Sequence, residues 1–113
     1  MKKLGFMAIC LTAGCTTVSD LRGQAPFISL SSEKSATELA GCFSDAWSQR
    51  TGTVNTVNRA DGFSMTLTYL VYGSALPAAV IDVSDKGTSR EVTVHARKGD
   101  AGTKLRSEIQ GCV

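Results

Sequence analysis

The first 15 residues constrain the rest of this chain most. Two lysines precede an uncharged apolar stretch from Leu4 to Leu11, and small residues stand directly before Cys15. This order is typical of a bacterial export signal, and the apolar stretch is shorter than the about 20 residues that span a bilayer. We therefore expect residues 1–14 to be a lipoprotein signal peptide that is removed, and Cys15 to be the site of lipidation.

Lipid on Cys15 would make the membrane the first partner of the chain. One acyl chain anchors only marginally, whereas bacterial lipoproteins generally carry two or three, so we expect lasting attachment. Thr16 stands where an aspartate is the usual signal for retention in the inner membrane. We therefore expect the periplasmic face of the outer membrane. The alternative is an ordinary cleaved signal with a coincidental cysteine, and Thr12 favours it because such motifs usually have leucine there.

Once the signal is removed, the chain is electrically neutral. The sequence has 12 Lys and Arg, of which Lys2 and Lys3 leave with the signal, so ten remain against 10 Asp and Glu. Nucleic-acid-binding domains are usually basic, so this class is disfavoured. The remaining length of about 99 residues fits one domain with a modest core.

Two cysteines remain in the part that follows Cys15. Cys42 and Cys112 form an even pair in a compartment where disulfides persist, so we expect them to be joined. The alternative is two buried free thiols. Closing a loop of about 70 residues would stabilise the fold by about 4 kcal/mol in the chain-entropy model, which is comparable to the whole stability of a small domain.

Residues 15–31 have no clear hydrophobic period and contain one glycine and one proline. We interpret them as a lipid-anchored tether. Phe27, Ile28 and Leu30 could instead dock on the domain as an edge segment, and a plain spacer is the alternative.

Helical patterns lie at both ends of the expected domain, residues 32–113. Ser35 and Glu38 fit a capping box, and apolar residues follow at helical spacing up to a stop at Gly52. Near the other end, one apolar face predicts a helix over about 103–112.

Between the helices, alternating patterns predict strands. Residues 63–72 alternate with a period of two, and 53–58 are a candidate hairpin partner. A second hairpin is predicted from 79–83 and 92–96, with a turn at 85–87 and Pro77 separating it from the preceding strand. The predicted fold is α+β, a two-layer sandwich of an N-terminal helix, a three- to four-stranded antiparallel sheet and a C-terminal helix, stapled by one disulfide.

No set of residues predicts catalysis. His95 is the only histidine, and no serine lies in a nucleophile elbow, so we interpret it as a solvated strand residue. The cysteines lack the spacing of zinc ligands, so we expect no metal. Residues 98–104 lack the Walker spacing and are interpreted as a turn and helix cap. Asp82 and Asp85 are interpreted as turn residues. We expect no enzyme activity and no cofactor.

Two surface features remain open. One is a basic patch of four side chains, Arg90, His95, Arg97 and Lys98, which could meet lipid phosphates or an acidic partner. The favoured alternative is that these are solvated side chains that protect a strand edge from pairing. Trp47 and Tyr72 are the large aromatic residues that would matter if exposed, and the helical pattern places Trp47 in the core.

Several short segments together resemble one group of proteins. They are Cys15-Thr16-Thr17-Val18, Ser32-Glu33-Lys34-Ser35, Cys42 followed by Trp47, Arg59-Ala60-Asp61-Gly62-Phe63, and Gly111-Cys112. In these the chain resembles small uncharacterised proteobacterial lipoproteins, some of which carry the label sugar transporter ATPase. The missing Walker motif argues against that label here. The resemblance implies envelope location and carries over no activity.

The functional prediction follows from location and from the lack of a catalytic set. We expect a non-enzymatic binding or structural module of the cell envelope that binds an unknown envelope protein. One mode open to a narrow antiparallel sheet is pairing with an added strand. The alternative is a periplasmic inhibitor or immunity protein that neutralises a toxic or lytic enzyme.

Overall fold

The computed structural model describes residues 17–113. It is an α+β fold with an open five-stranded antiparallel sheet in the order β1-β5-β4-β3-β2. Its elements are α2 (Val18–Arg22), β1 (Ile28–Ser32), α3 (Ala36–Ser48), β2 (Thr53–Arg59), β3 (Gly62–Val71), β4 (Ser74–Asp85), β5 (Arg90–Ala96) and α4 (Thr103–Cys112). None of the helices in this part of the chain is long and apolar enough to cross a membrane.

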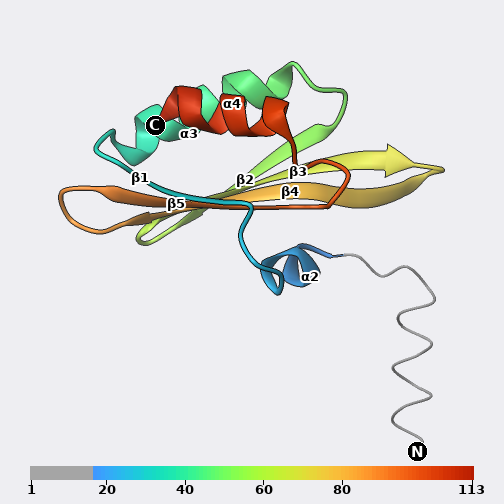
Figure 1. Ribbon diagram of the computed structural model, residues 1–113, viewed down its shortest axis with the longest axis horizontal. Coiled ribbons are helices and arrows are strands. Elements are labelled where there is room, and N and C mark those ends of the chain that lie inside the picture. Colours follow the sequence, from blue (N-terminus) through green and yellow to red (C-terminus); the bar gives the residue numbers. More distant parts are fainter. Residues whose placement is uncertain (1–16) are drawn as a thin grey trace, which may run out of the picture.

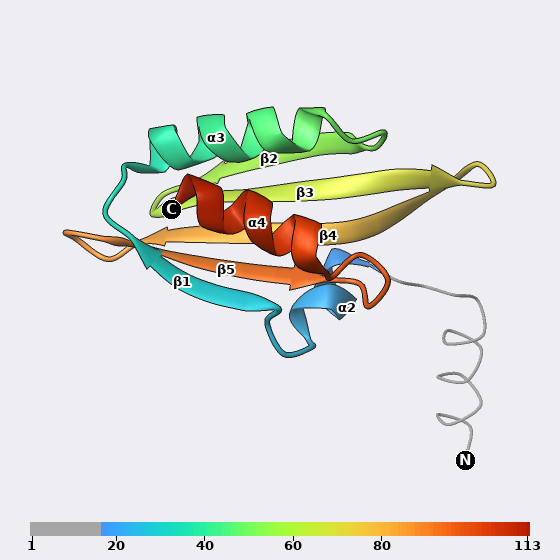
Figure 2. The same cartoon turned by 45° about the horizontal axis from the view of Figure 1, so that its top comes forward.

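The helices lie on both faces of the sheet but cover them unequally. Figures 1 and 2 show α3 and α4 side by side over one face, while the short helix α2 lies against the other. On that second face α2 packs against β4 and β5. We call this second face of the sheet the α2 face. Because α2 is only five residues long, it leaves much of the α2 face uncovered.

The main core lies between the sheet and the layer of α3 and α4. Alternate residues of the strands point to this side, which is the period-two arrangement that the sequence predicts. Trp47 has no exposed surface, as its place in the helical pattern predicts. The core residues of the central strands are Phe63, Met65, Leu67, Ala79, Ile81, Val83, Val92 and Val94, and those of the helices are Leu39, Phe43, Trp47, Leu105, Ile109 and Cys112.

The beginning of α3 follows the sequence signal closely. The Ser35 hydroxyl accepts from the backbone N–H of Glu38 at 3.1 Å, and the Glu38 carboxylate accepts from the backbone N–H of Ser35 at 3.2 Å. This reciprocal pair is the predicted capping box. The helix ends at Ser48, four residues before the predicted stop at Gly52.

Covalent and ionic links join the two helices of the main layer. Cys42 and Cys112 form a disulfide with a Cα–Cα distance of 5.7 Å, so the predicted pairing is confirmed. Arg50, just after α3, donates to Glu108 of α4 at 2.5 Å and to the hydroxyl of Tyr69 at 3.5 Å. The side chains of Arg50 and Glu108 are each only 14% exposed, so this ion pair is largely shielded from water. Through its two partners, Arg50 links the end of α3 to α4 and to β3.

The predicted strand count was too low, because the sheet has five strands. The additional strand is β1, which comes from the segment predicted as a tether. Ile28 pairs with Val94 and Leu30 with Val92, so the edge-docking alternative describes this segment. Because β1 pairs with β5 and α2 packs against β4 and β5, the structure places both elements on the sheet.

Pro77 does not separate two hairpins as predicted. It lies inside β4, opposite Thr68, where the register of β3 and β4 shifts between Leu67 and Thr68. A strand tolerates proline at such an irregularity because no regular ladder hydrogen bond has to be donated there. As a result β4 runs unbroken through two successive hairpins.

Candidate binding groove on the α2 face

An open groove runs along the α2 face between α2 and the edge of the sheet. It forms because α2 packs against β4 and β5 and leaves β2 and β3 uncovered. Side chains of α2 make one wall, β3 makes the floor, and β2 makes the outer rim. The volume of the groove is about 320 Å³, and it is lined by Val18, Arg22, Asn55, Val57, Arg59, Ser64 and Thr66.

A polar network lies at one end of this groove. Arg22 of α2 donates to both carboxylate oxygens of Asp82, at 2.9 Å from Nε and 2.8 Å from the terminal nitrogen. Arg59 of β2 donates to the same carboxylate at 3.0 Å. Ser64 donates to it at 2.6 Å and accepts from both arginines. Three elements therefore meet on one carboxylate, which we call the Asp82 cluster.

The Asp82 cluster carries a net positive charge. Burial alone would raise the pKa of Asp82, but hydrogen bonds from Arg22 and Ser64 and the charges of Arg22 and Arg59 together lower it below the usual range. The carboxylate is thus ionised at neutral pH and balances only one of two guanidinium groups. Because Arg59 keeps 44% of its side chain exposed, the groove presents positive charge to solvent.

The rim of the groove is a free sheet edge. β2 is the last strand of the sheet, and six of its seven residues are exposed. The opposite edge, β1, has five residues, of which two are exposed. One side of an edge strand offers unpaired backbone N–H and C=O groups. β2 contains no proline and no charge before Arg59, so it lacks the common devices that block strand addition.

Within the described residues, the hydroxyl of Ser64 has no strong base beside it. A serine nucleophile needs a neighbouring base that takes its proton, and Asp82, which accepts from Ser64, is a weak base because hydrogen bonds and the charges of two arginines lower its pKa. Among residues 17–113, no three His, Cys, Asp or Glu side chains lie together as a metal site. What the groove offers is a free strand edge beside exposed positive charge.

The structure separates Arg90 from the other residues of the predicted basic patch. Arg90 lies at the start of β5, only 14% exposed, and donates to backbone carbonyls of Glu33 and Lys34. Arg97 pairs with Asp100 beyond the other end of that strand. Arg90 therefore serves to fasten the chain after β1.

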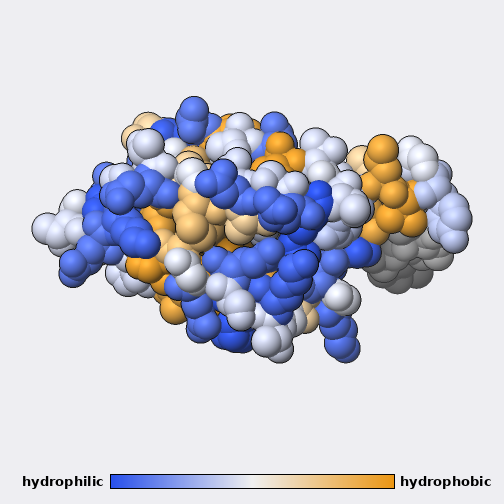
Figure 3. All heavy atoms as spheres, turned by 90° about the horizontal axis from the view of Figure 1, so that it is seen from above, coloured by the Kyte–Doolittle hydropathy of each residue, from blue (hydrophilic) through white to orange (hydrophobic). Residues whose placement is uncertain are grey.

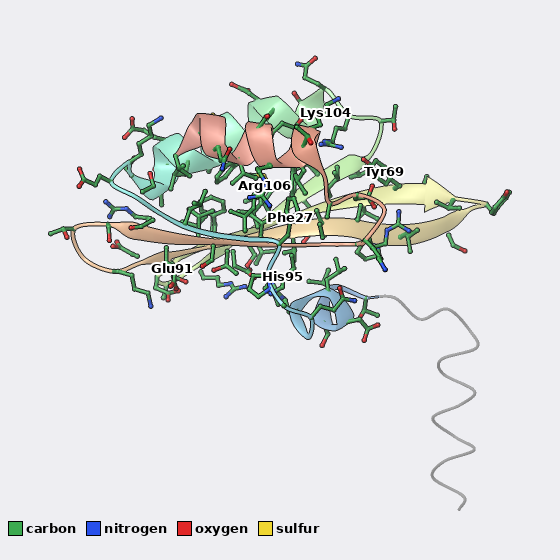
Figure 4. All side chains as sticks on the ribbon, viewed as in Figure 1. Phe27, Tyr69, Glu91, His95, Lys104 and Arg106 are labelled. Atoms are coloured by element: carbon green, nitrogen blue, oxygen red, sulfur yellow. A yellow bond between two sulfur atoms is a disulfide. The ribbon has the colours of Figure 1, made fainter. Side chains whose placement is uncertain are left out.

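His95 is buried, so its predicted solvated position is wrong. It is 8% exposed, on the face of β5 against which α2 packs, and Figure 4 shows it next to α2. Its Nδ1 has no hydrogen-bond partner in the described part of the chain. The alternation of β5 did predict this face, but not the helix that covers it.

Other predicted residues fall at separate places. Cys15 lies outside the described residues, so its lipidation stays a prediction. Tyr72 is fully exposed at the end of the β3–β4 hairpin and does not line the groove. The residues of the Asp82 cluster were not predicted as a site. Arg22 and Asp82 stand 60 positions apart, and Asp82 is no turn residue but a partner of two arginines. The only sequence signal was a charged residue within an apolar strand.

Comparison with known proteins adds no relative. No protein-family model, curated protein or solved structure matches this chain.

Proposed function

We propose that this chain is a lipid-anchored, non-enzymatic module of the bacterial envelope that binds an extended segment of another envelope protein along β2. The anchor is Cys15, at the end of a leader with the order of a lipoprotein signal. The periplasmic face of the outer membrane is the proposed location.

One observation carries the binding proposal, namely the exposed edge of β2 beside the groove. A strand added to β2 would gain main-chain hydrogen bonds, which supply affinity in strand addition. Its alternate side chains would lie next to those of Asn55, Val57 and Arg59 on the α2 face. A small apolar side chain fits beside Val57, which is 54% exposed, and a carboxylate fits beside Arg59. The proposed ligand is therefore an extended segment with an acidic residue.

The oxidising compartment is supported by the disulfide between Cys42 and Cys112. The disulfide fastens the helices over the opposite face of the sheet and leaves β2 free. The module would thus be rigid before it binds, which reduces the entropic cost of association.

Cross-linking in living cells tests the binding proposal. A photoreactive amino acid is placed at Asn55 in the full chain, and captured proteins are identified by mass spectrometry. The matched control is Ser44, an exposed residue of α3 on the other side of the molecule. We expect a repeated envelope partner from Asn55 and none from Ser44. Equal capture from both positions, or none, would count against the proposal.

A charge on the rim gives a second test. Lysine on an edge strand discourages pairing, so Val57→Lys should abolish capture from Asn55. Because Val57 is exposed, the free energy of unfolding should change by no more than about 0.5 kcal/mol. Val57→Thr, which keeps the β-branched shape without charge, is the control and should retain capture.

The nature of the captured partner decides the second proposal. If the partner is a toxic or lytic enzyme whose activity falls on binding, the module is an inhibitor or immunity protein that uses the same edge. Intact-mass analysis of the membrane fraction tests the anchor separately, and a mature chain without fatty acid would overturn it.

A further inference from the structure

The β3–β4 hairpin extends past the rest of the sheet. Pairing of β2 with β3 ends at Thr53 and Thr68, and pairing of β5 with β4 ends at Ala96 and Ala79. Beyond these pairs, β3 and β4 pair only with each other, up to Val71 and Ser74. Figures 1 and 2 show this hairpin as the projecting end of the molecule. We call residues 69–76 the hairpin tip.

The hairpin tip exposes apolar side chains. Leu70 is 76% exposed, Val71 is 40% exposed, and Tyr72 is fully exposed. These three consecutive residues are three of the four large hydrophobic side chains that residues 17–113 expose. Figure 3 shows apolar atoms gathered at this end of the molecule, while the helix layer beside it is mostly polar.

The hairpin tip is also uncharged. No Asp, Glu, Lys or Arg occurs from Gly62 to Ile81, although the chain as a whole is 19% charged. Charged side chains on exposed strands are a common device that blocks association. An uncharged apolar tip is suited to a surface of low polarity.

The turn itself holds an unusual residue. Tyr72 and Gly73 have φ angles of 52° and 79°, as both central residues of a type I′ turn do. Asparagine, aspartate and glycine normally occupy such positions, and a tyrosine there costs free energy. A fully exposed tyrosine that costs stability is explained if it serves a surface outside the chain.

The described part of the chain begins on the side of the molecule that faces the hairpin tip (Figures 1 and 2). Cys15 precedes Thr17 by two residues, which span at most about 7 Å. Val18 and Thr66 line the same groove, and Thr66 is four residues before Leu70 on β3, or about 13 Å along the strand. In Figures 1 and 2, α2 begins on the side of the molecule that faces the tip. A bilayer that holds acyl chains on Cys15 is therefore within reach of the tip.

From these observations we infer that the hairpin tip inserts Leu70, Val71 and Tyr72 into the headgroup region of the bilayer that carries the lipid anchor. This inference depends on the proposed lipidation of Cys15. Tyrosine prefers this interface because its ring is apolar and its hydroxyl is polar. The anchor and tip together would hold the module in one orientation on the membrane.

Fluorescence quenching by brominated lipids tests the inference. The full lipidated chain is reconstituted into vesicles of phosphatidylethanolamine and phosphatidylglycerol with brominated acyl chains. Trp47 is fully buried and supplies a baseline that lipids do not reach. Tyr72→Trp adds a reporter at the tip. Thr88→Trp adds one at the exposed β4–β5 turn, which lies at the other end of the molecule in Figure 1.

We expect the Tyr72→Trp variant to be quenched several-fold more strongly than the Thr88→Trp variant. Quenching of the Thr88→Trp variant should not exceed the baseline set by Trp47. Equal quenching of the two variants would overturn the inference. A photoreactive residue at position 72 that cross-links to a second copy or to another protein, and not to lipid, would also overturn it and make the tip a protein-docking surface.

Intact mass measured on the same samples separates this inference from the proposed anchor. An acylated chain without tip quenching refutes the insertion and leaves the anchor standing. A chain without fatty acid refutes the anchor, and the insertion fails with it.

Discussion

At the scale of single residues, Tyr72 is where local stability and proposed function oppose each other. Its φ of 52° lies in the left-handed region, which costs most residues about 1–2 kcal/mol and asparagine less. We therefore expect Tyr72→Asn to raise the free energy of unfolding by about 0.5–1 kcal/mol, measured by urea unfolding.

Tyr72→Ala is the matched control, because it removes the ring but keeps the strained Cβ. It should be no more stable than the unchanged chain. An asparagine variant less stable than the alanine variant would show that the backbone at Tyr72 is not strained.

Asp82 is the second residue whose role can be measured. Replacing it with asparagine leaves two arginines without their carboxylate, so Asp82→Asn should cost about 1–3 kcal/mol at neutral pH. The pKa of Asp82 is lowered in the folded protein, so its contribution is present above the unfolded value of about 3.9. It is lost as the pH falls through the folded value.

Urea unfolding of the unchanged chain and of the Asp82→Asn variant at several pH values checks this. The difference in unfolding free energy between the two chains should be constant above about pH 5 and shrink below about pH 4. A difference that stays the same down to about pH 2 would contradict the assignment.

At the scale of elements, the disulfide fastens α3 to α4 across a separation of 70 residues. We expect the double variant Cys42→Ala, Cys112→Ala to lose about 4 kcal/mol of unfolding free energy, because the unfolded chain regains the entropy of the open loop. Reducing agent should lower the stability of the unchanged chain and leave the double variant unaffected. A loss below about 1 kcal/mol would mean that the core alone holds the helices together.

The elements differ in how far the sequence predicted them. The helices α3 and α4 and the β4–β5 hairpin followed from capping, period and turn residues, all of which act within a few positions. β1 and α2 were not predicted as regular elements. Five residues are too few for a clear period, and both elements are stabilised by partners far away in the sequence: Val92 and Val94 for β1, and Asp82 for α2.

At the scale of the whole molecule, the short connection between Cys15 and α2 should determine the orientation on the membrane. A longer connection lowers the effective concentration of the tip at the bilayer. Inserting about 20 Gly and Ser residues between Thr16 and Thr17 should therefore reduce the lipid quenching of the Tyr72→Trp variant several-fold. The same insertion in the Thr88→Trp variant is the control. Unchanged quenching would mean that the tip inserts without help from the anchor.

The sequence by itself determined the local features of this protein. Its leader predicts the anchor at Cys15, its capping box began α3, and its cysteines predicted the disulfide. The tertiary structure alone decided the surfaces, because each depends on which strands become neighbours. The strand order makes β2 an edge, and the packing of α2 on β4 brings Arg22 to Asp82. The pairing of β3 with β4 beyond the ends of β2 and β5 leaves the hairpin tip without neighbouring strands among residues 17–113. Such contacts join residues far apart in the chain, and no local pattern encodes them.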